Sequence, residues 1–392
     1  MSQIFEIFGF RLDDNSQEAQ SHRARAWCPF MNDVCDGGGN RYATTINLDN
    51  PLFQELKQKF PSKSELVPGV CSLELVPGQM PWIVCPRRLL ALGREQMGVR
   101  RYQAQLEKYL LSLLGYPPGT RLGIWREVKL QYSEAEGGTV KKFDYTFDYV
   151  LMPLKNVSIG EILEADETAP VQLSLKTITS SPLSKGIQQL QKRGFRVTSD
   201  PIAAGGYIVH DYPIGQPSII EIMTSSTSGG DKKKRSQIAQ AFEDAMLGRP
   251  HLAPGINYRQ VWARMASQLL VKSEVAMGWA GVAIWVVQDV LVDYISQSTG
   301  LNMRDFISDQ AGEVNMLSFS YGDPLARSAT GVIDLPVVEL FAGPIAPVPI
   351  EQAEKKSSFI DIVRLPVQPP IRELMRLLVN HGPAKYQVVV LS

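Results

Sequence analysis

The chain of 392 residues contains only four histidines, scattered along its length, and no HExxH pattern. This scarcity argues against a histidine-based metal site, and no sequence motif marks a histidine as the base of a serine or cysteine nucleophile. Basic and acidic residues balance at 40 each, so the formal net charge is zero. A protein that binds polyanions over its whole surface is therefore not expected, although local basic patches stay possible.

Long apolar runs are also missing from the sequence. The most apolar stretch, VAMGWAGVAIWVV at 275–287, is too short to span a membrane and favours a buried strand. The opening MSQIFEIFGF has no basic segment followed by a long apolar core, so it predicts no signal peptide. We therefore expect a cytoplasmic protein with no membrane partner, in which cysteines stay reduced.

Helical and strand-like segments alternate along the chain. Apolar spacing predicts helices at 49–60, 87–114, 184–195 and 257–278, and a late helix in PPIRELMRLLVNH. Apolar runs bounded by turn residues predict strands at 121–132, 143–154, 218–226 and 280–287. The order of these elements predicts an α/β (α+β) fold with a mixed β-sheet flanked by helices.

All four cysteines, Cys28, Cys35, Cys71 and Cys85, lie in the first quarter of the chain. Cys28 and Cys85 are each followed by proline, and the ELVPG repeat at 65–69 and 74–78 predicts a turn that presents Cys71. Four thiolates arranged tetrahedrally form a closed structural site for zinc or iron. The alternative is four unrelated buried cysteines, but their clustering favours the metal site.

The segments WCPF, GVCSLEL and WIVCPRRLL resemble the four-cysteine element of the NotI/EagI family of type II restriction endonucleases, in the PD-(D/E)xK superfamily. The opening IFEIFGFRL is also similar to that family's N-terminal stretch. The resemblance implies a structural iron or zinc ion, held by the four cysteines in a small N-terminal lobe. It also implies a restriction-endonuclease-like core that cuts double-stranded DNA with Mg²⁺.

The resemblance also points to acidic residues that would hold the catalytic Mg²⁺. FDYTFDYVL, with Asp148, is similar to the superfamily's Asp-bearing strand, and IIEIMTSSTSG, with Glu221, to the strand that follows it. WREVKL carries Glu127, which is similar to an upstream glutamate that joins the cluster. A charge in an apolar strand is costly to bury unless it is paired or binds metal. The alternative is that each carboxylate simply lies on the solvent face.

The position where the superfamily usually carries lysine holds Met223 in this chain. A thioether carries no positive charge and orients water poorly by hydrogen bonding. Lys129, two residues after Glu127, is the first candidate to replace it, followed by Lys176 and Lys232. The missing lysine keeps two alternatives open: a catalytically inactive DNA-binding protein of the same fold, and a modification-dependent nuclease.

We expect an N-terminal region with the cysteine lobe (1–115), a nuclease core (116–300) with an insertion near 160–212, and a C-terminal region of unassigned role (301–392). A homodimer matches the two-fold symmetry of a palindromic DNA site. The basic residues expected to contact DNA are Arg87, Arg88, Arg100, Arg101, Lys232 and Lys233. Taken singly, each could instead be a solvated surface charge.

Overall fold

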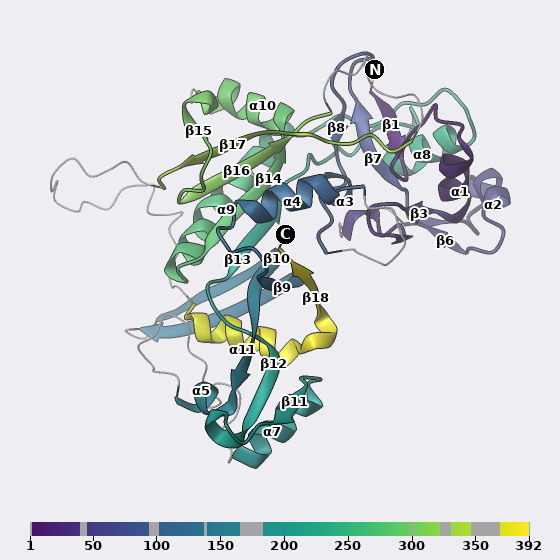
Figure 1. Cartoon of the computed structure of the whole chain (residues 1–392). Coiled ribbons are helices and arrows are strands. Elements are labelled where there is room, and N and C mark those ends of the chain that lie inside the picture. Colours follow the sequence, from purple (N-terminus) through teal and green to yellow (C-terminus); the bar gives the residue numbers. More distant parts are fainter. Residues whose placement is uncertain are drawn as a thin grey trace.

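The computed structural model describes residues 2–39, 45–93, 102–136, 139–164, 183–299, 302–321, 331–345 and 369–391. Within these residues a ten-stranded mixed sheet forms the centre of the molecule, and a smaller N-terminal lobe lies beside it (Figure 1). The predicted mixed α/β class is therefore confirmed. Every helix in the described ranges is too short or too polar to cross a lipid bilayer.

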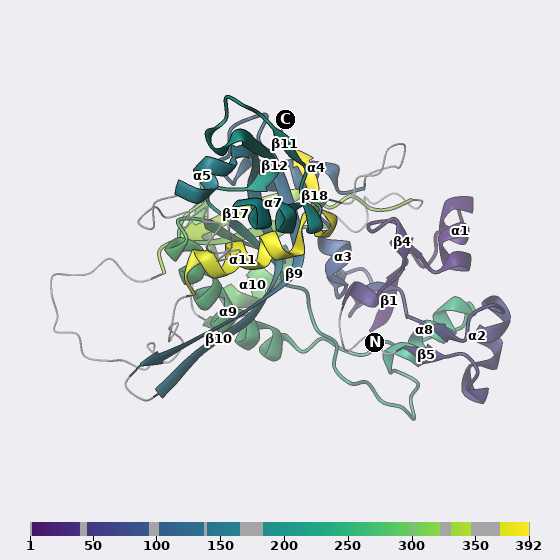
Figure 2. The same ribbon diagram turned by 90° about the horizontal axis from the view of Figure 1, so that it is seen from below.

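The central sheet combines antiparallel and parallel strands. Its strands are β9 (Arg121–Glu136), β10 (Thr139–Ser158), β11 (Val197–Ser199), β12 (Tyr207–Pro213), β13 (Ser218–Ile222), β14 (Val282–Gln288), β15 (Ile307–Ser308), β16 (Val314–Phe319), β17 (Val337–Gly343) and β18 (Tyr386–Val390). β10 is antiparallel to β9 and β13, whereas β14 is parallel to both β13 and β16. The far halves of β9 and β10 project from the body as a two-stranded arm (Figure 2).

Helices cover both faces of this sheet because strand side chains alternate between two apolar faces. α4 (Ala104–Ser112) packs its leucines against β9, β10, β13 and β14 on one face. α9 (Tyr258–Gly278) and α11 (Ile371–His381) cover the other face, close to the predicted 257–278 and C-terminal helices. α10 (Asp289–Thr299) follows β14 and packs beside α9.

The N-terminal lobe is built around a four-stranded sheet. Its elements are β1 (Gln3–Ile7), β2 (Phe10–Arg11), β3 (Trp27–Cys28), β4 (Asp33–Val34), β5 (Ile46–Asn47), β6 (Glu65–Leu66), β7 (Val70–Glu74), β8 (Trp82–Ile83), α1 (Gln17–Arg25), α2 (Gln54–Lys59) and α3 (Pro86–Leu89). A later helix, α8 (Ile238–Met246), joins them, and its Phe242 ring packs edge-on against Phe8. The predicted boundary at residue 115 therefore misses one helix of the lobe.

The two remaining regions also join the sheet. Strands β15 to β18 come from the C-terminal region, to which the sequence assigned no role, and β18 pairs with β9. The predicted insertion contributes α5 (Ile159–Glu164), α7 (Leu183–Lys192), β11 and β12, which share a small apolar core with Val157 of β10 and Val379 of α11. Lys176 lies outside the described residues.

Candidate functional site

Asp148 and Glu221 lie next to each other on neighbouring strands. Tyr149 of β10 pairs with Ile220 of β13, so the residues one step further along each strand face one another at the end of this ladder. At this point a side chain replaces a backbone acceptor: Asp148 Oδ2 accepts a hydrogen bond from the Ile222 amide at 2.8 Å. Two acidic residues far apart in sequence thus meet, as predicted.

Lys272 on α9 completes this cluster. Its Nζ lies 2.6 Å from Glu221 Oε2 and donates a second hydrogen bond to the Thr146 carbonyl at 2.8 Å. The ammonium lies over the rings of Phe147 and Trp285, at 5.6 and 5.7 Å from their centroids. Lys272 and Glu221 are both buried, so this ion pair is shielded from water.

The cluster contains more buried negative charge than its one lysine neutralises. Burial raises the pKa of Glu221 to about 8; Lys272 opposes this rise, and the nearby Asp148 adds to it. Burial likewise raises the pKa of Asp148, against the Ile222 amide and the charges of Lys272 and Arg87. Among the described atoms, buried Glu221 Oε1 has no hydrogen-bond partner. A cation bound at Glu221 Oε1 would neutralise part of this negative charge and give the oxygen a partner.

Glu127 lies beside the cluster and interacts with Arg87. The β9–β10 ladder pairs Phe147 with Val128 and Tyr149 with Arg126, and it skips the Glu127–Asp148 step. Glu127 has a φ of 50°, which is uncommon for a residue other than glycine. Its side chain is 64% exposed, and its Oε1 lies 3.3 Å from Arg87 Nη2. Glu127 therefore borders the Asp148–Glu221 pair, and within the described residues it forms no hydrogen bond with Lys272.

Neither Met223 nor Lys129 supplies a positive charge to the cluster. Met223 is half-buried and packs into the apolar cluster that α9 forms with α10 and β14. Lys129 is on the surface, where its Nζ lies 3.7 Å from Asp144 Oδ1. The amine comes instead from Lys272, which sequence reasoning missed because it lies 51 positions after Glu221.

Arg88 is part of the interior and does not face solvent. Its side chain is 1% exposed, its Nε and Nη2 bind the Glu6 carboxylate at 2.8 and 3.0 Å, and Nη2 also binds the Ile333 carbonyl. Glu6 accepts further hydrogen bonds from Ser72 and Tyr321. The prediction that Arg88 contacts DNA is therefore corrected: this arginine joins the lobe to the C-terminal strands.

The other predicted basic residues lie in different settings. Arg87 is largely buried and pairs with Asp36 and Glu127. Lys232 and Lys233 are exposed in a turn, which the Asp231 carboxylate stabilises by accepting a hydrogen bond from the Lys233 amide at 2.8 Å. Arg100 and Arg101 lie outside the described residues. Of the predicted DNA contacts described, the two lysines alone are fully accessible to a phosphate backbone.

The four cysteines gather in one cluster together with Phe30 and Met31. Cys71 is the second residue of strand β7, so the predicted turn position is wrong: VCSLE pairs with β1 as a strand. The Gly9 amide donates a hydrogen bond to Cys71 Sγ at 3.2 Å. Within the described ranges, no three or more Cys, His, Asp or Glu side chains stand in metal-binding geometry.

The thiols affect one another's pKa values. Burial raises the pKa of Cys28 to about 12 and also raises that of Cys35. A hydrogen bond with Cys71 lowers the pKa of Cys85 and raises that of Cys71. A backbone N–H donor such as the Gly9 amide is suited to stabilising a thiolate.

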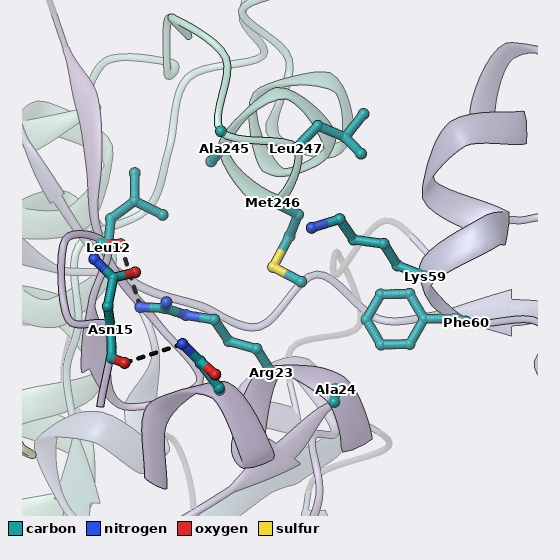
Figure 3. Close-up of a pocket in the computed structure, with 11 residues that line it drawn as sticks. Leu12, Asn15, Arg23, Ala24, Lys59, Phe60, Ala245, Met246 and Leu247 are labelled. Atoms are coloured by element: carbon teal, nitrogen blue, oxygen red, sulfur yellow. Dashed lines mark hydrogen bonds between the residues drawn. The ribbon is translucent and has the colours of Figure 1, made fainter. Parts of the chain in front are cut away.

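The lobe also contains a separate cavity of about 540 Å³ between α1, the end of α2 and the end of α8 (Figure 3). Arg23 and Lys59 bring positive charge to its wall, and Phe60 and Met246 bring apolar surface. The Arg23 guanidinium is bound by the carbonyls of Asp14 and Arg11. None of the residues lining this cavity belongs to the Asp148–Glu221–Lys272 cluster.

Comparison of the chain with protein-family models and with curated proteins found no match. The chemistry of the candidate site is therefore inferred from its own residues.

Proposed function

We propose that this protein is a Mg²⁺-dependent endonuclease that cuts double-stranded DNA at specific sites, as type II restriction enzymes do. The observation that carries the proposal is the meeting of Asp148, Glu221 and Lys272 at the junction of β10, β13 and α9. An aspartate and a glutamate on adjacent strands, with an amine beside them, is the set that the PD-(D/E)xK resemblance implies. The fold proposed for the central sheet is accordingly restriction-endonuclease-like.

Asp148 and the open Glu221 Oε1 are the groups that would hold Mg²⁺. They fit this ion because Mg²⁺ takes oxygen ligands and commonly uses only one or two carboxylates, with water and substrate phosphates completing its shell. When bound, the ion stabilises negative charge on the phosphate and makes a water molecule more acidic. Asp148 and Glu221 would bring the negative charge that attracts the ion into this largely buried site.

Lys272 acts on the same site through Glu221. By donating to Oε2 it opposes the rise in the pKa of Glu221 and so favours the ionised carboxylate, while Oε1 has no hydrogen-bond partner among the described residues. The rings of Phe147 and Trp285 exclude water from the ammonium. A charge interacts more strongly with its neighbours in this low-dielectric environment than in water. Lys272 thus supplies the positive charge that Met223 lacks, which weakens the reason to expect an inactive DNA-binding protein.

The cysteine cluster is proposed to hold one structural zinc or iron ion. Four thiols in one cluster, with the Gly9 amide donating to Cys71 Sγ, have the chemistry that such an ion requires. Cutting both strands of a palindromic site needs two copies of the Asp148–Glu221–Lys272 cluster, so we propose a homodimer.

Cleavage of plasmid DNA tests the proposal. The purified full chain with Mg²⁺ is expected to yield fragments with fixed ends, and Asp148→Asn and Glu221→Gln are expected to abolish them. Asp144→Asn is the matched control, because Asp144 lies on the same strand but pairs with Lys129 at the surface. Cleavage that persists in Asp148→Asn or Glu221→Gln would refute the site, and loss of cleavage in Asp144→Asn would show that the assay does not discriminate.

A further inference from the structure

Arg87 lies between the cysteine cluster and the carboxylate site. Its Nε and Nη2 donate to Asp36 Oδ2 at 3.2 and 3.1 Å, and the same Nη2 lies 3.3 Å from Glu127 Oε1. Its positive charge also opposes the rise in the pKa of Asp148. The side chain is only 11% exposed, so it has little freedom to turn into solvent.

Both partners of the Asp36–Arg87 ion pair are attached directly to the cysteines. Asp36 follows Cys35, and Arg87 comes two residues after Cys85, which is the N-cap of α3. The turn after Asp36 packs tightly on α3, since a Cβ added at Gly38 would lie 2.7 Å from the Pro86 ring and 3.2 Å from Cys85 Sγ. The Asp36 carboxylate also holds this turn by accepting from the Gly38 amide at 2.8 Å.

We propose that Arg87 is a positioning residue through which the cysteine cluster sets the cation affinity of the Asp148–Glu221 site. The inference rests on the function proposed above. With the cluster intact, Asp36 draws the Arg87 guanidinium toward the lobe. When Asp36 or the cluster is disturbed, the guanidinium keeps only its acidic partners at the active site, Glu127 and Asp148. Its charge then competes with a divalent cation for those carboxylates.

Mn²⁺ titration followed by electron paramagnetic resonance measures this affinity without DNA and without turnover. Asp36→Asn removes the lobe partner of Arg87 and is expected to weaken Mn²⁺ binding about tenfold, a typical coupling between two sites. Asp33→Asn is the matched control, since exposed Asp33 also lies two residues from Cys35 but binds only the Val34 amide in the described contacts. It is expected to leave Mn²⁺ affinity unchanged.

The decisive variant is Arg87→Gln. If Arg87 transmits the effect, this variant binds Mn²⁺ at least as tightly as the native protein, and the double variant Asp36→Asn/Arg87→Gln binds it equally well. Cys35→Ser, which alters the least buried cysteine, is expected to weaken Mn²⁺ binding in the native background and to have no effect beside Arg87→Gln.

A purely structural role for Arg87 predicts the opposite sign. Arg87→Gln would then weaken Mn²⁺ binding, and the double variant would be no better than Asp36→Asn; either result overturns the proposal. Mn²⁺ binding that is unaffected by Asp36→Asn overturns it as well. If no Mn²⁺ binding depends on Asp148 and Glu221 in the native protein, the proposed function falls together with this inference.

Discussion

Lys272 Nζ and Glu221 Oε2 lie 2.6 Å apart in the interior, although helix α9 and strand β13 contribute them from separate parts of the chain. The contact joins a buried amine to a carboxylate that lies near Asp148. The other oxygen of this carboxylate, Oε1, has no hydrogen-bond partner among the described residues. This pair has consequences for activity and for stability that can be measured separately.

Replacing Lys272 by methionine should cost activity. Lys272→Met keeps the length and apolar packing of the side chain between Phe147 and Trp285 but removes its charge. We expect cleavage with Mg²⁺ to fall on the order of 100-fold, the size of effect seen when one electrostatic group is lost from an active site. Lys129→Met is the control and should cut normally. Equal rates for the native protein and Lys272→Met, per folded molecule, would exclude a catalytic role.

The same pair should show strong coupling in stability. Lys272→Met removes the amine that donates to buried Glu221, so we expect a loss of about 3 kcal/mol in the free energy of unfolding above pH 8, where this carboxylate is ionised in the native protein. Adding Glu221→Gln to that variant removes the charge and should restore most of the loss. Urea denaturation of the four proteins of this double-mutant cycle measures the coupling. Additive effects of the two substitutions would contradict a direct interaction.

The cysteine cluster should carry metal at a fixed ratio. We expect one zinc or iron ion for each chain by atomic emission, and its loss in Cys85→Ser, because Cys85 interacts with the other three thiols. Removal of the ion by a chelator should lower the unfolding temperature, since binding energy at a structural site is folding energy. Four unrelated cysteines would instead give no bound ion and no response to the chelator.

The exposed lysines should contribute salt-dependent DNA affinity. Changing Lys232 and Lys233 together to glutamine removes two phosphate contacts, so the slope of log affinity against log salt should become shallower by about 2. Lys108→Gln with Lys385→Gln removes the same charge from other exposed positions and serves as the control. An unchanged slope in the Lys232 and Lys233 variant would place the DNA on another surface.

Local sequence patterns predicted the sheet and two of the site residues well. Apolar runs interrupted by a single acid marked Asp148 and Glu221, and the helical pattern at 257–278 matched the 21-residue α9 closely. Such signals survive because strand and helix periodicity depend on near neighbours in the chain. They placed each carboxylate on a strand, whereas the resemblance to the PD-(D/E)xK superfamily implied that the two strands are neighbours.

Features decided by contacts distant in sequence escaped prediction. Lys272 reaches the site because α9 crosses the sheet, and nothing in its own segment marks it. The sequence predicted Arg88 to be a surface cation. In the structure it is buried and pairs with Glu6, which lies 82 positions earlier. Cys71 was expected on a turn because of the flanking Pro-Gly pairs, but pairing with β1 extends that segment into a strand.

The path of the chain through α8 makes the lobe inseparable from the rest of the protein. Between β13, which carries Glu221, and α9, which carries Lys272, the backbone leaves the central sheet, packs α8 against β1, and returns. A truncated fragment beginning at residue 116 would therefore contain α8 but lack the N-terminal residues against which its apolar side packs. Glu221 and Lys272 would then be connected by a segment that has lost the lobe on which it folds.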